Sequence, residues 1–347
     1  MITERENWLR TVEFRNPEWI PCGLSIAPLA WDTHREKLEA VAVRHPMLFG
    51  DYKPGSMKFG EYGPGYRQGE YYRDNWGCVW YNTVGGLEGQ VVEHPLADWS
   101  ALAHYRPPDP RTQTERGERD WSKIAADVKA AREAGRLLWG DGERLFDRLY
   151  FLRGYENLME DIATDEPHLP LLIEMLLDYE MRLIRMWLDL GVDVVGFHTD
   201  IGSQRALMIH PDKFRRYIKP LFMELFQTCR RADAHVNLSS DGHVLEIVDD
   251  LIECGVSVHD PQLRANTLDG IVRCYKGRLC ATADLDRQMF AFCTPEEARQ
   301  HVKDVVEAMY SPKGGLMVSA SVWDANTAVE NIESLCCALE ELCPRPF

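Results

Sequence analysis

The stretch VDVVGFHTD (Val192–Asp200) combines the pattern of a buried strand with polar residues at its end. Its apolar, β-branched run stops at Phe197, and the tripeptide HTD follows. Similar runs recur from about residue 136 onward, with long amphipathic helical patterns between them. This alternation predicts parallel strands joined by helical crossovers. The predicted strands are Arg136–Trp139, Val192–Phe197, Ala234–Leu238, Val256–Val258, Arg278–Ala281 and Gly315–Ser319.

The helical patterns between these strands have clear faces and clear starts. Glu166–Leu190 places leucine, isoleucine, methionine and tryptophan at helical spacing, which gives one broad apolar face. Another helix is predicted to begin at Thr294, because a proline suits its first turn and Glu297 completes a capping box. Thr327 and Glu330 repeat this spacing and predict the start of the last helix.

Residues 1–135 have a different composition, rich in Gly, Pro, Tyr and Trp. They predict long ordered loops and a few irregular strands over the mouth of a barrel. Within them, Ile20–Leu24 predicts the first barrel strand, and Arg116–Ala134 predicts a helix. We therefore predict one α/β domain over residues 1–347, a (β/α)₈ TIM barrel with an elaborated N-terminal loop region and regular βα units in residues 136–347. A separate N-terminal domain is the alternative.

Composition excludes several classes of protein. The 347 residues are 45% hydrophobic and 27% charged, which is typical of a globular protein. The net charge of −16 disfavours nucleic acid and anionic membranes as partners. No window approaches the roughly 18 consecutive apolar residues of a membrane span, and no signal peptide is visible, so we expect a cytoplasmic protein. The ten cysteines lack a C-x-x-C pair and are expected to be free thiols.

Polar residues follow five consecutive predicted strands. They are His198 and Asp200, then Ser239, Asp241 and His243, then His259 and Asp260, then Asp284 and Asp286, and finally Ser319, Ser321 and Asp324. In a parallel barrel these strand ends meet on one face, where such enzymes carry their catalytic groups. Any single Asp, Ser or Thr at such a place is as well explained as the N-cap of the next helix. Histidines and aspartates after five successive strands predict one functional pocket.

A zinc site is a second prediction for these strand ends. His198, Asp200 and Asp241 offer nitrogen and oxygen donors, and the His-x-Asp spacing puts two of them on the same side of an extended segment. The alternative is a histidine hydrogen-bonded to a neighbouring carboxylate. No nucleophile elbow, Walker loop, dinucleotide-binding glycine motif or H-E-x-x-H motif is present.

Several segments resemble the uroporphyrinogen decarboxylase superfamily and follow one another in its order. They are Arg148–Leu158, Asp200–Pro211, Asp241–Val244, Asp250–Val256, Asp286–Gln288, Cys293–Glu297 and Glu330–Ile332. The resemblance covers nearly the whole chain and implies a (β/α)₈ barrel. That superfamily contains uroporphyrinogen decarboxylases and methyltransferases linked to corrinoids or coenzyme M.

The resemblance favours the methyltransferase branch. The decarboxylases carry an Arg-Gln-Ala-Gly-Arg-type run that grips substrate carboxylates, and this sequence has no counterpart. The coenzyme M enzymes have a zinc-binding His-x-Cys-Gly after a barrel strand, where this chain has SSDG, residues 239–242. A His-Ser-Asp-Gly-like version of that stretch is similar to the substrate-side methyltransferases of O-demethylase systems, although Ser239 departs from it.

The resemblance thus implies a methyltransferase that moves a methyl group from a small methylated substrate, such as a methoxyaromatic compound, to the corrinoid (cobalamin) of a partner protein. Because the leaving oxygen needs an acid or a metal, His198, Asp200 and His243 are the predicted catalytic residues. The predicted substrate-binding residues are Gln204, Trp76, Trp80, Tyr81, Ser239, His259 and Asp286. A homodimer is compatible with this prediction. The alternatives are a decarboxylase of a polycarboxylate and a non-catalytic barrel that binds small molecules.

Overall fold

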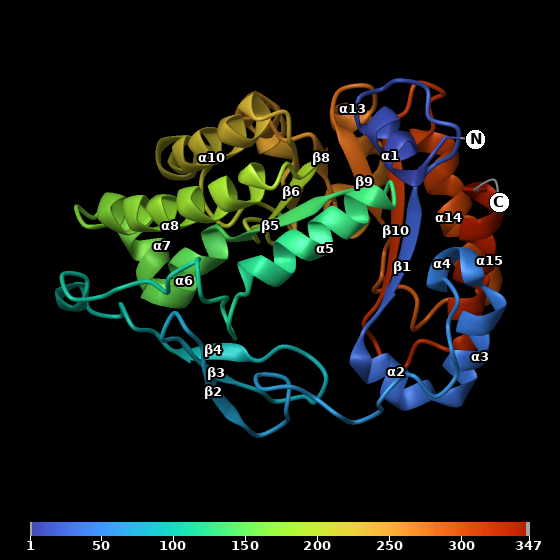
Figure 1. Ribbon diagram of the computed structural model, residues 1–347, viewed down its shortest axis with the longest axis horizontal. Coiled ribbons are helices and arrows are strands. Elements are labelled where there is room, and N and C mark those ends of the chain that lie inside the picture. The colour runs from blue at the N-terminus through green and yellow to red at the C-terminus, as the bar shows by residue number, and fades with distance from the viewer. Residues whose placement is uncertain (1, 345–347) are drawn as a thin grey trace.

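A parallel sheet of seven strands organises the computed structural model, which describes residues 2–344. The strands lie in the order β1-β10-β9-β8-β7-β6-β5 and curl into a barrel-like wall (Figure 1). They are β1 (Cys22–Ile26), β5 (Trp139–Arg144), β6 (Val194–His198), β7 (His235–Ser239), β8 (Val258–His259), β9 (Cys280–Asp284) and β10 (Leu316–Val322). All neighbours pair in parallel, so all carboxyl ends lie on one side. The predicted barrel class and the βα alternation are confirmed.

The sheet is open between its two edge strands, β1 and β5. Among the described residues these strands share no ladder, so the parallel sheet has seven strands where an ideal barrel has eight. The chain between them instead forms α2 (Pro28–His34), α3 (Glu36–Arg44), α4 (Pro46–Phe49), a small antiparallel sheet and α5 (Trp121–Glu133). The place of an eighth strand is therefore taken by an elaborated N-terminal region.

Helices cover the outer face of the parallel sheet. They are α6 (Phe146–Arg153), α7 (Tyr155–Thr164), α8 (Leu169–Asp189), α10 (Lys219–Arg231), α11 (Val248–Cys254), α13 (Leu268–Tyr275), α14 (Pro295–Met309) and α15 (Val329–Leu342), while α1 (Glu4–Val12) lies at the amino ends of the strands. Shorter helical pieces are η1 (Trp99–Ala101), α9 (Pro211–Lys213), the π-helix η2 (Phe214–Ile218), η3 (Leu245–Ile247) and α12 (Leu263–Asn266). In the described region, none of these helices combines the length and the apolar character that a membrane crossing requires.

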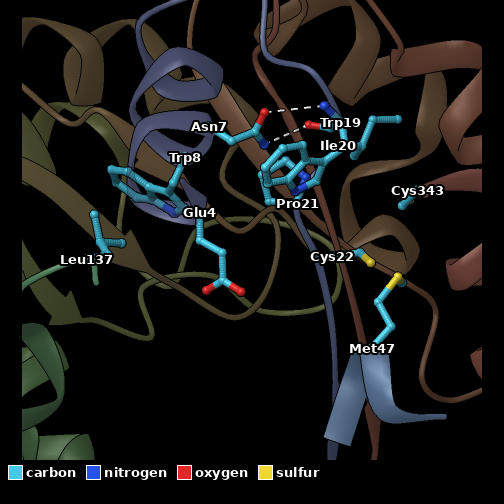
Figure 2. A pocket seen from close by; sticks show the side chains of 10 residues that line it. All are labelled: Glu4, Asn7, Trp8, Trp19, Ile20, Pro21, Cys22, Met47, Leu137 and Cys343. Atoms are coloured by element: carbon cyan, nitrogen blue, oxygen red, sulfur yellow. Dashed lines mark hydrogen bonds between the residues drawn. The ribbon is translucent and has the colours of Figure 1, made fainter. Parts of the chain in front are cut away.

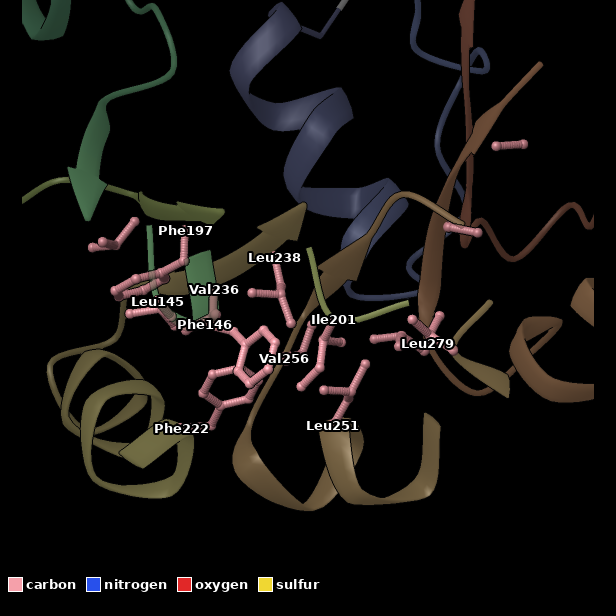
Figure 3. Packing of buried hydrophobic residues seen from close by; sticks show 14 of the residues in the cluster. Leu145, Phe146, Phe197, Ile201, Phe222, Val236, Leu238, Leu251, Val256 and Leu279 are labelled. Carbon is pink, nitrogen blue, oxygen red and sulfur yellow. The ribbon is translucent and has the colours of Figure 1, made fainter. Parts of the chain in front are cut away.

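The core between strands and helices is made of large apolar side chains. Figure 3 shows Phe197 of β6 and Val236 of β7 on the side of Phe222 of α10, and Leu251 of α11 beside Val256. The ring of Phe226 lies 4.9 Å from Phe197 and 5.0 Å from Phe222. On α8, buried residues recur every three or four positions, as the predicted apolar face requires. This packing holds the strands that carry the candidate site.

Two predicted helix starts had different outcomes. The capping box before α14 is confirmed, because the hydroxyl of Thr294 accepts from the backbone N–H of Glu297 and the Glu297 side chain accepts in return. The predicted capping box before α15 is not present, so that prediction was wrong. That helix begins at Val329 after Ala328, and no side chain caps it. The Thr327 hydroxyl is buried and makes no hydrogen bond to any described residue, so it does not cap the helix.

The predicted strand Arg136–Trp139 was placed too early, since β5 runs from Trp139 to Arg144. Its sequence WGDGER is polar and glycine-rich and is not a typical strand sequence. The glycines are explained by packing, because a Cβ added at Gly140 would lie 2.8 Å from the Trp187 ring. At Gly142 an added Cβ would overlap the ring of Phe197. The two glycines therefore let bulky core side chains approach the strand backbone.

The N-terminal region contains a three-stranded antiparallel sheet in the order β2-β3-β4. Its strands are β2 (Tyr71–Arg73), β3 (Val79–Tyr81) and β4 (Gln90–Glu93). Figure 1 shows this sheet below α6, at the side where the chain leaves β1 for α2. It therefore lies near the carboxyl ends of the parallel strands.

A buried charge cluster joins this region to the parallel sheet. The guanidinium of Arg148 on α6 is fully buried, and its Nη2 lies 2.5 Å from Glu115 and 3.3 Å from Glu143. Its Nη1 lies 3.6 Å from Asp74. Because two of these carboxylates come from the N-terminal region and one from β5, the cluster fixes the two parts against each other.

Candidate active site

A cavity of about 740 Å³ opens at the carboxyl ends of the parallel strands. Its lining comes from β5 to β10 and from the segments that follow them. The lining residues are Arg144, Asp147, His198, Asp200, Ser239, Asp241, Asp260, Thr282, Asp284, Arg287, Ser319, Ser321 and Trp323. Its volume is within the range of about 300–1,000 Å³ that is typical of ligand pockets. The structure thus brings the predicted residues His198, Asp200, Ser239 and Asp241 together.

Three aspartates form a hydrogen-bonded chain along one wall. The backbone N–H of Asp200 donates to Asp147 Oδ2 at 2.8 Å, and that of Asp241 donates to Asp200 Oδ1 at 3.0 Å. The Tyr150 hydroxyl donates to the other oxygen of Asp147. Burial, and next the charge of Asp147, raise the pKa of Asp200 to about 6. Asp200 is therefore able to exchange a proton near neutral pH.

Asp260 is the most strongly shifted acid of the cavity. The Ser239 hydroxyl donates to its Oδ2 at 2.5 Å, and the backbone N–H of Ser240 donates to its Oδ1 at 2.9 Å. Burial outweighs these two hydrogen bonds and raises the pKa of Asp260 to about 8. Burial also raises the pKa of Asp284 to about 6, against the opposing charge of Arg287. At pH 7 the Asp260 carboxyl is mostly protonated and can act as an acid.

Both arginines of the cavity are already paired. Arg144 donates to the two carboxylate oxygens of Glu88 at 2.9 and 2.8 Å. Arg287 donates to Asp241 Oδ2 at 2.6 Å, and its guanidinium carbon lies 5.8 Å from the centre of the Trp323 ring. The positive charge of the cavity is therefore neutralised by partners from the protein itself.

His198 lies at the end of β6, with its backbone paired to Arg144 of β5. Burial, and next the charge of Arg144, hold the pKa of His198 below its usual value of 6.5. The imidazole is consequently neutral at pH 7, which fits a hydrogen-bonding role better than the acid role predicted from the sequence. In residues 2–344 no side chain makes a hydrogen bond to its ring.

Two predicted histidines lie outside the cavity lining. His243 is held by the carbonyl of Ala265, 2.9 Å from its Nδ1. His259 is fully buried with its Nδ1 3.0 Å from the Tyr275 hydroxyl, and burial lowers its pKa to about 3. Asp260, the neighbour of His259, points into the cavity instead, because side chains alternate along an extended chain.

Gln204 and Asp286 lie in loops beyond the strand ends. Gln204 is exposed, and Asp286 accepts from Arg264 at 2.9 Å. Neither side chain lines the cavity.

The predicted aromatic edge of the pocket belongs instead to the interior of the N-terminal region. Trp76 and Trp80 are each 1% exposed. Their indole N–H groups donate to Glu143 and Asp74 respectively, at 2.9 and 2.8 Å. Tyr81 packs on Tyr71 with ring centres 4.7 Å apart. Burying these rings stabilises the small sheet, so they are removed from any ligand in the cavity.

Sequence reasoning missed several residues that line the cavity. They are Arg144, Asp147, Thr282, Arg287 and Trp323. Arg144 was missed because β5 was placed too early, and Asp147 because it lies on the following helix. Thr282 was missed because the strand was expected to end one residue before it. Extending the predicted strand Arg278–Ala281 by one residue would have found Thr282, whereas Arg144 lies five residues beyond the predicted end of its strand.

The donor set does not fit the predicted zinc site. In the described part of the chain, no group of three His, Cys, Asp or Glu side chains is arranged to hold a metal ion. His198, Asp200 and Asp241 all line the cavity, but Asp200 accepts from the backbone N–H of Asp241, and Asp241 accepts from Arg287. We therefore derive no step through a metal.

A second cavity, of about 210 Å³, lies at the amino ends of the strands (Figure 2). It is lined by Glu4, Asn7, Trp8, Trp19, Ile20, Pro21, Cys22, Met47, Leu137 and Cys343. A hydrogen bond from the Cys343 thiol lowers the pKa of Cys22. Because polar strand ends and shifted carboxyls gather at the other cavity, we assign the candidate active site there.

Comparisons with known proteins agree with this fold. A family model described as uroporphyrinogen decarboxylase (URO-D) matches residues 146–342. A solved methyltransferase from Methanosarcina mazei matches with a TM-score of 0.64 over 98% of this chain and 99% of its own, at 15% identity. A dihydropteroate synthase from Xanthomonas albilineans covers 60% of this chain and 69% of its own, with a TM-score of only 0.36 at 11% identity. No curated protein sequence matches the chain. The extent of the family match shows that the chain belongs to the uroporphyrinogen decarboxylase (URO-D) family.

Proposed function

We propose that the protein is a methyltransferase that removes a methyl group from an ether oxygen of a small molecule and passes it to the corrinoid of a partner protein. The observation that carries this proposal is the buried carboxyl of Asp260 in the cavity, whose pKa burial raises to about 8. Family membership and the fold shared with a protein named a methyltransferase support it.

The chemistry requires a proton at the leaving oxygen. The corrinoid supplies a nucleophilic cobalt(I) centre that accepts the methyl group. When the bond between carbon and the ether oxygen breaks, the oxygen keeps the electron pair and takes the proton of Asp260, so that an alcohol leaves. Ser239 orients the carboxyl through its 2.5 Å hydrogen bond. Asp260 then regains a proton from solvent through the cavity.

The neighbouring groups fit this role for Asp260. Its raised pKa reflects burial, and the charges of Asp284 and Asp241 add to the effect. A carboxyl with a pKa near the working pH is efficient as an acid, because it is protonated yet gives up its proton readily. Neutral His198 provides a hydrogen bond to the substrate without competing as the proton donor.

The charge of the cavity disfavours decarboxylation of a polycarboxylate. Five aspartates line it against two arginines, and those arginines are paired with Glu88 and Asp241. A substrate with several carboxylates would meet repulsion from the aspartates and find no uncommitted guanidinium.

Methyl transfer to cob(I)alamin tests the proposed function. The full chain is mixed with cob(I)alamin and a panel of methyl ethers, and methylcobalamin is followed by its absorption spectrum. We expect formation of methylcobalamin that depends on the protein and on one ether. Release of CO₂ from uroporphyrinogen without any methyl transfer would overturn the proposal and support the decarboxylase alternative.

A further inference from the structure

The residues that line the cavity are almost all polar in type, although polar and apolar atoms face it in similar measure. Of its thirteen lining residues, twelve are charged or hydrogen-bonding, and Trp323 is the single aromatic one. A methoxyaromatic ring needs apolar walls on both of its faces, because its burial is driven by the loss of apolar surface. Trp323 is the one large apolar ring in the lining, so the cavity suits a ring with hydroxyl groups around a C–H face better than the predicted methoxyaromatic substrate.

The balance of charge also excludes an anionic substrate. Arg144 is bound to Glu88 and Arg287 to Asp241, and within residues 2–344 this leaves Asp147, Asp200 and Asp260 without an ion pair. Arg287 approaches Asp284 only to 3.9 Å. An added negative charge would raise the energy of these carboxylates further.

The carboxylates are dispersed around the cavity and do not converge on one point. Asp147 comes from α6, and the others follow β6, β7 and β8 or end β9. Within residues 2–344 no three of these donors are grouped closely enough to hold an ion. A small cation would neutralise the carboxylates at one point of the wall only. A ligand with several hydroxyl groups would reach carboxylate oxygens on several sides of the cavity.

Further hydrogen-bonding groups face the cavity without a partner. Across the described residues, no side-chain hydrogen bond engages the hydroxyls of Thr282 and Ser319 or the imidazole of His198. Thr282 and Ser319 lie on the inward positions of β9 and β10, where partly exposed residues alternate with buried ones. The half-exposed ring of Trp323 at the mouth offers an apolar face of the kind that packs on C–H groups.

From this arrangement we propose that the substrate is a methyl ether of a polyhydroxylated compound, such as an O-methylated monosaccharide or cyclitol. The aspartates accept hydrogen bonds from its hydroxyl groups, and Thr282 and Ser319 donate or accept further hydrogen bonds. Trp323 covers one face of its ring. This inference rests on the proposed function for the role of the methyl group. The recognition of the polyol itself rests on the cavity alone.

Ligand binding in the absence of any corrinoid tests the proposal. The full chain is titrated calorimetrically with 3-O-methylglucose, other O-methylated sugars and O-methylated inositols, next to 2-methoxyphenol and tetramethylammonium chloride. We expect saturable binding of at least one polyol ether and none of the other two probes. Binding of 2-methoxyphenol or tetramethylammonium, or of no polyol ether, overturns the proposal.

A matched pair of variants locates the binding. Thr282→Val removes one hydroxyl from the cavity, and Thr164→Val removes one from the exposed end of α7. We expect about three- to tenfold weaker polyol binding for T282V and unchanged binding for T164V, since one hydrogen bond is lost. Equal effects of both variants overturn the assignment, and thermal unfolding without ligand verifies that both are folded. Polyol binding without methyl transfer refutes only the proposed function, whereas transfer from an aromatic ether refutes only the polyol.

Discussion

The two ends of the parallel sheet use charge in opposite ways. At the amino end, charged groups are paired: Arg5 holds Asp193 through two hydrogen bonds of 2.8 and 2.6 Å, and His235 lies 3.0 Å from Glu13. At the carboxyl end, carboxyls such as Asp260 are buried with too few cations, and their pKa values rise. The paired charges at the amino end therefore stabilise the fold, whereas the buried carboxyls at the carboxyl end lower its stability and supply reactive groups.

The largest effect is expected for Asp260→Asn at the carboxyl end. Asn keeps the shape of a protonated carboxyl but cannot deliver its proton, so methyl transfer should fall by about 100-fold or more. The same change should stabilise the protein at pH 8. The unfolded state loses this proton near pH 3.9 and the folded state only near 8, so stability falls as pH rises between these values.

Transfer assays and urea unfolding at pH 5 and pH 8 measure both effects. Asp189→Asn, at the exposed end of α8, is the matched control and should change neither quantity. Full activity of D260N would show that the carboxyl end is not specialised in the way described.

A smaller effect is expected for Asp193→Asn at the amino end. Asp193 also accepts from the backbone N–H of Leu138 at 2.9 Å. In the Asn variant the side-chain NH₂ would face either this N–H or the guanidinium of Arg5, and the ion pair with Arg5 would be lost. We expect a loss of about 1–3 kcal/mol in the free energy of unfolding, with unchanged methyl transfer per folded molecule. Urea unfolding and the transfer assay measure these quantities. A large loss of transfer with intact stability would contradict the division between the two ends.

The smallest effect, a change in how stability depends on pH, is expected for His259→Asn. His259 belongs to the carboxyl end by position, but its side chain points outward to Tyr275. Its folded pKa is about 3, so the unfolded state gains a proton below pH 6.5 that the folded state does not bind. Stability is therefore lost as pH falls from 6.5 toward 3, by at most about 1.4 kcal/mol per pH unit.

The variant should show a shallower decrease between pH 6.5 and pH 5 than the wild-type protein. Urea unfolding across that range measures the difference in slope. Identical slopes would mean that His259 is protonated in the folded state.

The sequence predicted the order of the strands well and their ends poorly. The prediction Gly315–Ser319 became Leu316–Val322, and Arg278–Ala281 became Cys280–Asp284. The apolar run marks where both faces of a strand are buried, whereas near the carboxyl end only the outer face stays apolar. In β10 this gives buried Ala320 between partly exposed Ser319 and Ser321. A rule that ends a strand at its last apolar run therefore stops where the site begins.

The aromatic residues show a second limit of sequence reasoning. A tryptophan in a polar loop can border a ligand or fill a local core, and composition does not separate the two. Trp76 and Trp80 can be buried because carboxylates accept hydrogen bonds from their indole N–H groups. Trp80 is paired with nearby Asp74, whereas Trp76 is paired with Glu143, 67 residues away in the sequence. Such long-range pairing, like that of Arg144 with Glu88, is visible only in three dimensions.

The buried guanidinium of Arg148 restricts how proteins of this kind can be recombined. A chimaera that joined residues 136–347 to the first part of a relative would inherit this charge in the interior. Unless the new partner supplied carboxylates equivalent to Asp74 and Glu115, Arg148 would keep only Glu143 as an ion-pair partner, at a cost of up to about 3–5 kcal/mol. The N-terminal region and the parallel sheet are therefore expected to be inherited together. New specificities should then arise by substitution of residues that line the cavity.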